Sequence, residues 1–217
     1  MQRSKIESRC NMKNSRGLRS KLSILDDYCD LEEELSMNYH NITHDDMLNG
    51  SGLRVVLWCS GCEHHCKNCQ NPQTWDYESG ISFDESAKKE LFDELEKDYI
   101  SGVTFSGGDP LASNNLSNIY NLMKEIKSEF PQKTIWLYTG YTWEQIMYPV
   151  VTNDFNIEKR ATDQMREQIV SYCDVVVDGE YVDELRDVTL HWCGSPNQRV
   201  IDVQKSLSSG KVVLYEE

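Results

Sequence analysis

Four of the eight cysteines in this chain of 217 residues are clustered in one short run, WCSGCEHHCKNCQNPQTW. Cys59, Cys62, Cys66 and Cys69 follow one another with the spacing CxxCxxxCxxC. Four thiolates at such a spacing can form the tetrahedral ligand set of a structural zinc ion. Three thiolates on a compact loop can instead bind three irons of a cubane iron-sulfur cluster and leave the fourth iron open for chemistry. The cysteines therefore predict a metal centre of one of these two kinds.

The compartment in which the chain works bears on the state of these thiols. The longest apolar runs, such as RVVLW and VVVDGEYV, are too short to span a membrane. The N-terminus lacks the apolar core of a secretory signal peptide, so we expect a cytoplasmic protein with no membrane association. In a reducing compartment, clustered cysteines are more often metal ligands or catalytic groups than disulfides.

The charge of the chain disfavours nucleic acid as a partner. The formal net charge is -14 at pH 7, with 36 acidic side chains against 22 basic ones. Binding to phosphate groups needs a basic footprint, which these totals do not supply. The hydrophobic fraction of 39% is enough for one sizeable core, and the length is typical of a single domain.

The first 36 residues differ in composition from the remainder. Residues 1–21 carry seven basic side chains and one acidic one, whereas residues 22–36 carry six acidic side chains and no basic one. Neither half has an amphipathic period. We therefore expect residues 1–36 to be a flexible charged extension, with Cys10 and Cys29 as free thiols, and residues 37–217 to form one folded domain.

From Met37 onward, patterns typical of strands and helices alternate along the chain. Strands are predicted for residues 53–59, 101–108, 133–140, 174–182, 198–202 and 211–216, and helices for 83–100, 114–130 and 162–173. The first of these helices is predicted to start at Asp84 or Ser86. Strands that alternate with helices imply parallel βαβ units, so the sequence predicts an α/β fold, a partial or open barrel with parallel strands and the helices outside.

Three polar segments follow directly after predicted strands. They are the cysteine loop, SGGDP at residues 106–110 and YTGYTWE at residues 138–144. Ligands of α/β folds gather at the carboxyl ends of parallel strands, so we expect these segments to lie on one face of the fold.

Cys59 differs from the other three clustered cysteines because it ends the predicted strand RVVLWC. A cysteine in that position most simply serves as a small buried apolar residue. Cys62, Cys66 and Cys69 remain as loop ligands. A site of four cysteines around zinc usually staples a small loop-rich unit, whereas this loop extends from an α/β core. These two features favour the iron-sulfur cluster and leave zinc as the alternative.

The loop SGCEHHCKNCQNPQTW resembles the CxxxCxxC loop of radical S-adenosylmethionine enzymes. Across residues 37–202, the segments MNYHNI, GLRVVLWCSGC, TFSGGDPL, WLYTGYTWE, VVDGEYV and GSPNQRVID resemble the activases of anaerobic ribonucleoside-triphosphate reductases. The resemblance implies a partial (β/α) barrel of the radical S-adenosylmethionine type, with a [4Fe-4S] cluster and S-adenosyl-L-methionine as cofactors. It also implies that S-adenosylmethionine is cleaved reductively to a 5′-deoxyadenosyl radical, which takes a hydrogen atom from a glycine of the reductase and leaves a glycyl radical.

The resemblance also assigns roles to single residues. Cys62, Cys66 and Cys69 are expected to ligate the cluster, and catalysis depends on them. The expected contacts to S-adenosylmethionine come from Asn68, Cys69, Gln70, Ser106, Gly107, Gly108, Asp109 and Thr139. Glycines suit this task because the absence of Cβ lets the backbone approach a ligand closely. The wider superfamily often has an aromatic residue before the last cysteine, whereas this chain has Asn68, so the residue that covers the adenine is open between Trp75 and Tyr77.

The partners implied by the resemblance are the large subunit of the reductase and a reduced electron donor of the flavodoxin or ferredoxin type. We expect Arg199, in GSPNQRVI, at the surface that meets the reductase, with a solvated arginine as the alternative. His64 and His65 are expected to be exposed to solvent and to bind no metal. Cys173 and Cys193 are expected to be core or surface thiols, because neither has a cysteine partner at ligand spacing.

Two other functions stay open at this point. One is a radical S-adenosylmethionine enzyme that acts on another glycyl-radical enzyme or on a small molecule. The other is a zinc-stapled interaction module without catalysis, which would purify as a colourless protein with stoichiometric zinc.

Overall fold

The computed structural model of the chain describes residues 37–149 and 157–217. The extension predicted for residues 1–36, with Cys10 and Cys29, lies outside the described residues, so its boundary at Met37 stays a prediction.

A single mixed sheet of seven strands organises this part of the chain, in the order β3-β1-β2-β4-β5-β6-β7. The strands are β1 (Asn38–Asp46), β2 (Arg54–Cys59), β3 (Ile81–Ser82), β4 (Gly102–Gly107), β5 (Thr134–Tyr138), β6 (Val175–Asp178) and β7 (Arg199–Asp202). The four central strands, β2, β4, β5 and β6, are parallel, as predicted. The prediction of parallel strands throughout is wrong at the edges, because β1, β3 and β7 pair antiparallel with their neighbours.

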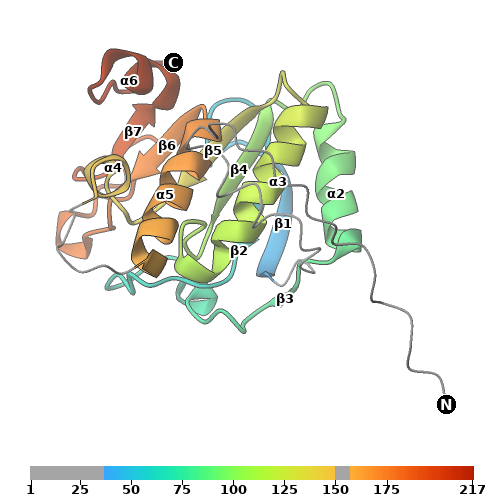
Figure 1. Cartoon of the computed structure of the whole chain (residues 1–217), viewed down its shortest axis with the longest axis horizontal. Helices are drawn as coiled ribbons and strands as arrows, with labels where there is room; N and C mark the ends of the chain where they lie inside the picture. The colour runs from blue at the N-terminus through green and yellow to red at the C-terminus, as the bar shows by residue number, and fades with distance from the viewer. Residues whose placement is uncertain (1–36, 150–156) are drawn as a thin grey trace, which may run out of the picture. The chain divides into compact units, whose positions relative to one another are not determined.

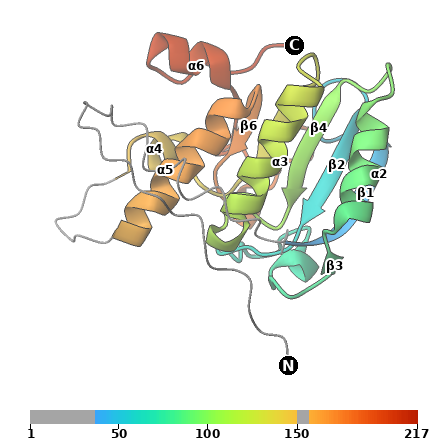
Figure 2. The same cartoon turned by 45° about the vertical axis from the view of Figure 1, so that its right-hand side comes forward.

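Helices α2, α3 and α5 run along one face of this sheet, as Figures 1 and 2 show. The described helices are α2 (Glu85–Leu95), α3 (Leu116–Glu129), α4 (Trp143–Met147), α5 (Ile157–Tyr172) and α6 (Val203–Ser209), with short 3₁₀ turns η1 (Pro72–Thr74), η2 (Ser113–Asn115) and η3 (Asp183–Leu185). Helix α2 starts after Asp84, whose carboxylate accepts the backbone N–H groups of Ser86 and Ala87 and so caps the helix. Among the described helices, none is long and apolar enough to cross a bilayer.

The main core lies between the sheet and these helices. Val55, Leu57, Val103 and Phe105 alternate along β2 and β4 and are fully buried against the helices, since successive side chains of a strand point to opposite faces. Burial of such side chains contributes about 1.5–3 kcal/mol each, which is the main force that holds the helices on the sheet.

The face of the sheet that carries no helix has a second, smaller core around Trp136, Val175 and Val177. Trp192 and Tyr215, from the C-terminal part of the chain, pack edge-on against Trp136. The sheet therefore has helices on one face and irregular segments on the other, which we call the inner face (Figure 1).

A buried arginine ties the inner face together at the amino end of the parallel strands. Arg54 is fully buried and donates hydrogen bonds to Thr104 Oγ1, Val103 O and both oxygens of Thr134. Its guanidinium also lies over the ring of Trp136, 5.3 Å from the centroid. Burial lowers the pKa of Arg54 to about 10, and the hydrogen bonds compensate the cost of burying the cation.

Several elements differ from the sequence-based expectation, and β3 and α6 are among those that were not predicted. Strand β1 was not predicted, because polar residues interrupt its pattern, and its pairing with β2 contains two register shifts. Helix α4 falls in a stretch without a clear period and is held by a capping box between Thr142 and Gln145. The predicted strand at 211–216 is wrong: this segment makes only an isolated bridge between Leu214 and Ile201.

Candidate active site at the carboxyl ends of the parallel strands

The three polar segments predicted to share one face lie together at the carboxyl ends of β2, β4 and β5. The cysteine loop meets the segment after β4 through two backbone hydrogen bonds of 2.7 Å, from Gly108 N to Cys59 O and from Asp109 N to Gly61 O. Thr139 N, directly after β5, bonds to Val177 O of β6 at 3.0 Å. In Figures 1 and 2 the teal segment with the cysteines lies at the end of the sheet opposite α6. The prediction of a common edge is confirmed.

The four clustered cysteines occupy two different environments. Cys59 is fully buried in the main core, and burial strongly raises the pKa of its thiol. Cys62, Cys66 and Cys69 are only partly buried. Burial raises the pKa of Cys62 to about 11 and also raises that of Cys66, so an electropositive ligand is needed to hold these groups as thiolates at neutral pH. The structure thus separates one core cysteine from three loop cysteines.

The chemistry of the loop fits an iron-sulfur cluster. Within the described residues, 37–149 and 157–217, no three His, Cys, Asp or Glu side chains lie close enough together to hold a single metal ion. A cubane cluster is larger than an ion, so its thiolates need to surround a volume rather than meet at a point. The backbone N–H of Asn71 donates to Cys69 Sγ at 3.3 Å, and hydrogen bonds to the sulfur ligands are a recurrent feature of such clusters.

The two glycines of SGGDP allow the segment after β4 to pack directly on the cysteine loop. Gly107 has φ +102°, and a Cβ there would lie 2.8 Å from backbone atoms of Cys59. A Cβ on Gly108 would lie 2.3 Å from Gly61 O. The close approach that we predicted for these glycines is therefore used, in this structure, between two backbone segments of the site.

Asp109 connects the segment after β4 to the segment after β5. The residue is buried, with 1% of its surface exposed. One oxygen, Oδ1, accepts the backbone N–H of Leu111 at 2.8 Å. The other, Oδ2, accepts from Thr139 Oγ1 at 2.9 Å and from Gly140 N at 3.0 Å. Asp109 and Thr139 were both predicted as cofactor contacts, and the structure brings them together as hydrogen-bond partners of each other.

His64 is not exposed, contrary to our expectation. Its side chain is only 10% exposed, with Nε2 at 2.8 Å from Asp109 Oδ2 and Nδ1 at 3.1 Å from Glu180 Oε1. Burial by itself lowers the pKa of His64, but the hydrogen bonds and charges of the two carboxylates outweigh it and raise the pKa overall. The neighbouring His65 is exposed, as predicted.

Glu63 is a site residue that the sequence analysis missed. Its carboxylate accepts hydrogen bonds from Tyr141 Oη at 2.7 Å, Tyr77 Oη at 3.0 Å and Ser113 N at 3.0 Å. Burial acts to raise its pKa, but these hydrogen bonds hold the pKa at about 2. No sequence signal identifies this role, because the partners come from three distant segments.

The two residues before Cys69 connect the loop to the segment after β6. Asn68 has a left-handed backbone, φ +55°, which asparagine tolerates better than most residues. Its side chain donates to Asp183 Oδ2 at 2.7 Å, and Lys67 Nζ bonds to Glu184 at 2.6 Å. Both pairs are at the surface, so each contributes little by itself.

The two aromatic residues considered for the adenine lie beneath or beside the loop. The ring of Tyr77 occupies the space where a Cβ of Gly61 would be, at 2.1 Å. Trp75 packs edge-on against His65 with 4.9 Å between ring centroids. Trp75 Nε1 is buried without a hydrogen-bond partner in the described structure.

A cleft of about 760 Å³ opens beside the cysteine loop on the inner face of the sheet. Cys69, Gln70 and Ser106 line one part of it, together with Trp58 and Tyr138 from the neighbouring strands. Within the described chain, Tyr138 Oη is buried and has no hydrogen-bond partner. Because an unpaired buried hydroxyl costs about 1–3 kcal/mol, the cleft is suited to a ligand with polar groups. S-adenosylmethionine meets that requirement.

Arg199 is paired within the protein, so the alternative of a solvated arginine is wrong, whereas its place at the surface that meets the reductase stays a prediction. Its guanidinium donates to both oxygens of Glu144, at 3.0 and 2.8 Å, and to Asp178, which is 1% exposed. These hydrogen bonds raise the pKa of Arg199 above its ordinary value. The residue joins β7 to β6 and α4.

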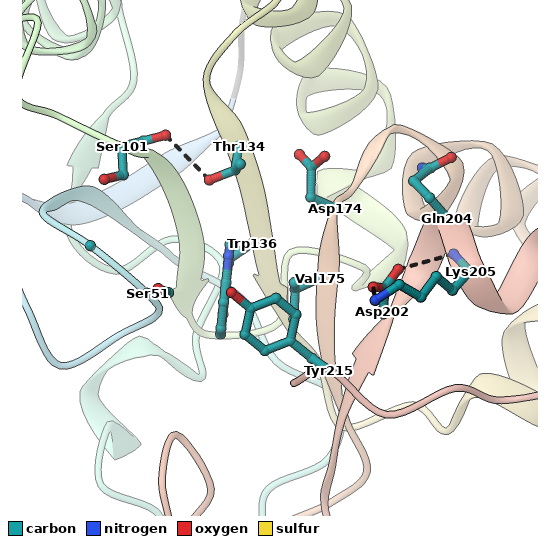
Figure 3. A pocket seen from close by; sticks show the side chains of 11 residues that line it. Ser51, Ser101, Thr134, Trp136, Asp174, Val175, Asp202, Gln204, Lys205 and Tyr215 are labelled. Atoms are coloured by element: carbon teal, nitrogen blue, oxygen red, sulfur yellow. Dashed lines mark hydrogen bonds and ion pairs between the residues drawn. The ribbon is translucent and has the colours of Figure 1, made fainter. Parts of the chain in front are cut away.

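A second cavity, of about 430 Å³, lies at the other edge of the sheet, where the parallel strands begin (Figure 3). Trp136 and Tyr215 form its apolar wall, and Asp202 pairs with Lys205 at its rim. Asp174 accepts from Lys127 Nζ and from a backbone N–H, so its carboxylate is also satisfied internally. These carboxylates therefore already have hydrogen-bond partners within the protein and do not require a ligand.

Comparisons with known proteins show what this chain is similar to. Residues 48–201 match the family described as a 4Fe-4S single cluster domain. The chain is 40% identical over 164 residues to the anaerobic ribonucleoside-triphosphate reductase-activating protein of Enterobacteria phage T4, covering 76% of this chain and 93% of that protein. It is 37% identical over 164 residues to the protein of the same name from Vibrio cholerae, covering 75% and 96%. For the one from Escherichia coli strain K12, the identity is 36% over 166 residues, covering 76% and 97%.

Proposed function

This chain belongs to the family of anaerobic ribonucleoside-triphosphate reductase-activating proteins, and from that premise we propose which of its residues perform the activation. It is a radical S-adenosylmethionine enzyme with a 4Fe-4S cluster that activates anaerobic ribonucleotide reductase. The cluster, when bound, supplies the electron that cleaves S-adenosylmethionine, and the radical so formed converts a glycine of the reductase to a glycyl radical. The protein has to hold the two cofactors in register and keep water from the reacting atoms.

The cluster ligands in this proposal are Cys62, Cys66 and Cys69. Three observations support them: they are the partly buried thiols of the loop, Cys59 is separated from them in the core, and Asn71 N donates to Cys69 Sγ. Three protein ligands leave one iron available to S-adenosylmethionine.

S-adenosylmethionine, in this proposal, lies in the cleft beside the loop. Ser106, Gly107, Gly108 and the backbone around Asn68 and Gln70 contact it directly, as the resemblance implied. The support is that Cys69, Gln70 and Ser106 line one cleft, in which Tyr138 Oη also lacks a partner.

Asp109 and Thr139 belong to the same proposed site in a different way. The carboxylate of Asp109 is occupied by Thr139, Gly140 and His64, so these residues set the shape of the cleft wall. We expect their contribution to S-adenosylmethionine binding to come through the position of the backbone that they hold.

The observation that carries this proposal is the direct bonding of the cysteine loop to SGGDP, through Gly108 N and Asp109 N. A zinc staple would not require the loop to be joined to a glycine-rich strand end beside a cleft. We also propose that the protein works in the cytoplasm, receives its electron from a reduced flavodoxin-type or ferredoxin-type protein, and docks on the large reductase subunit.

The test is anaerobic reconstitution of the full chain with iron and sulfide, followed by reduction with dithionite and addition of S-adenosylmethionine. We expect 5′-deoxyadenosine by chromatography and, with the large subunit of an anaerobic ribonucleoside-triphosphate reductase, a glycyl-radical signal by electron paramagnetic resonance (EPR). A protein shown to hold a reduced four-iron cluster that forms no 5′-deoxyadenosine would contradict the mechanism. A protein that forms 5′-deoxyadenosine but no glycyl radical would contradict the choice of partner.

A further inference from the structure

His64 holds an unusual position, because it lies inside the cysteine loop, yet its side chain points into the protein. Its imidazole bonds on both nitrogens, to Asp109 Oδ2 at 2.8 Å and to Glu180 Oε1 at 3.1 Å. Both partners are carboxylates, so the imidazole lies between two hydrogen-bond acceptors. With both nitrogens engaged in this way, the ring is committed to the protein rather than to a metal.

The two partners of His64 come from different strand ends. Asp109 follows β4, and the same Oδ2 that meets the imidazole also accepts from Thr139 Oγ1 and Gly140 N, after β5. Glu180 follows β6. One ring therefore connects the cysteine loop, which follows β2, to the segments after the other three parallel strands.

The ring is also fixed laterally by its packing. Tyr141 lies edge-on to it with 4.6 Å between centroids. A Cβ on Gly140 would lie 2.4 Å from His64 Cδ2, so the absence of a side chain at Gly140 makes room for the imidazole. A side chain bonded at both nitrogens and packed against Tyr141 and Gly140 is restricted in position, which is what a spacer between two binding elements requires.

We propose that His64 is a positioning residue that sets the distance and orientation between the cysteine loop and the strand ends that bind S-adenosylmethionine. The inference rests on the proposed function, because it concerns the register of the cluster relative to S-adenosylmethionine. It assigns to His64 no contact with either group. Loss of the imidazole leaves the three cysteines in place and removes the link between the loop and the carboxylates of Asp109 and Glu180, while the backbone hydrogen bonds of the loop remain.

The test compares His64→Gln with His64→Asn in the full chain after anaerobic reconstitution. The amide nitrogen of glutamine reaches about as far as Nε2 and can still donate to Asp109, whereas that of asparagine reaches only about as far as Nδ1. The control is His65→Asn, which changes the adjacent exposed histidine at φ +50°, a backbone conformation that asparagine tolerates.

Three quantities are measured: iron and sulfide content, the dissociation constant of S-adenosylmethionine, and the change that S-adenosylmethionine causes in the EPR spectrum of the reduced cluster. We expect all variants to carry the cluster. Loss of a hydrogen bond to a charged group should weaken S-adenosylmethionine binding by about tenfold or more in His64→Asn, while His64→Gln and His65→Asn stay within about threefold of the wild type. The spectral change should be reduced only in His64→Asn.

A second variant tests the same position without removing the imidazole. Gly140→Ala places a methyl group in the space that the His64 ring occupies, while Gly140 has no positive φ that would strain alanine. We expect it to weaken S-adenosylmethionine binding in the same sense as His64→Asn. This variant and His64→Gln decide the question even if His64→Asn fails to fold.

The inference is overturned if His64→Asn and Gly140→Ala bind S-adenosylmethionine as the wild type does. It is equally overturned if His64→Asn and His64→Gln both lose the cluster, because His64 would then be needed for assembly rather than for register. A wild-type protein that holds the cluster and shows no response to S-adenosylmethionine would instead contradict the proposed function itself.

Discussion

At the scale of single residues, the functional meaning of a cysteine here follows from its surroundings rather than from its place in the motif. Cys59 and Cys62 are both part of a CxxC pair, yet the first is in the main core and the second is on the loop. A fully buried thiol in apolar surroundings behaves as a small hydrophobic residue, and its raised pKa keeps it protonated. The spacing alone permits a four-cysteine site, whereas burial favours a site of three.

This difference yields a prediction for four single variants. Cys62→Ala, Cys66→Ala and Cys69→Ala should each reduce iron incorporation to background, because each removes one of three protein ligands. Cys59→Ala should keep the cluster and lose only stability, by about 1 kcal/mol for one small buried group. Iron and sulfide analysis, with the visible absorption of the reconstituted protein, gives the readout. Loss of the cluster in Cys59→Ala would instead support a site with four cysteine ligands.

At the scale of elements, the site depends on how closely two backbone segments approach each other. The segment after β4 contacts the cysteine loop where Gly107 and Gly108 have no side chains, and two backbone hydrogen bonds join them. The carboxylate of Asp109 then carries the connection to the segment after β5. The glycine-rich motif therefore joins the cysteine loop to the end of β4 by close backbone packing, and we call this contact the joint.

Gly108→Ala tests this joint, because its Cβ would lie 2.3 Å from the carbonyl oxygen of Gly61 and the two segments would have to separate. We expect the rate of 5′-deoxyadenosine formation to fall by about tenfold or more, because a displaced binding segment misplaces the reacting groups. Gly210→Ala is the matched control, since no atom lies within 4 Å of its Cβ position and only its φ of +67° is strained. That control should lose about 1 kcal/mol of stability and keep its activity.

Equal 5′-deoxyadenosine formation by Gly108→Ala and the wild type would show that the joint can relax without consequence. Thermal unfolding of both glycine variants separates a loss of the site from a loss of the fold.

At the scale of the whole molecule, the sheet places the site by its topology. Four parallel strands bring their carboxyl ends to one edge, and the antiparallel strands β1 and β7 extend the sheet on either side of these four. At the opposite end of the strands, the buried Arg54 crosslinks β2, β4 and β5. The buried arginine network and the candidate site are thus at opposite ends of the same strands.

A truncation tests whether this part of the chain is sufficient. A protein starting at Met37 should fold, take up the cluster and form 5′-deoxyadenosine at the rate of the full chain, because residues 1–36 carry neither a hydrophobic period nor ligand spacing. Parallel assays of the two proteins, together with glycyl-radical formation on the reductase, give the comparison. Reduced activity of the shorter protein would assign a role to the extension.

The sequence by itself determined the alternation of strands and helices after Met37, the shared edge of the polar segments and the separate status of Cys59. These features depend on local patterns: apolar periodicity, strand ends marked by glycine, and cysteine spacing. The same kind of reasoning failed for β1 and for residues 211–216, where pairing with a neighbouring strand, rather than local composition, decides the structure.

Only the tertiary structure decided the roles of Glu63, His64 and Arg199. Each appears in the sequence as an ordinary polar residue, and each acquires its function from partners that are distant along the chain, such as Tyr141 for Glu63, Asp109 for His64 and Asp178 for Arg199. Burial makes such contacts consequential, because a charged group removed from water must find its hydrogen bonds within the protein. Sequence spacing identifies ligands that share one loop, whereas the groups that hold the loop in place are identified only when the strands bring them together.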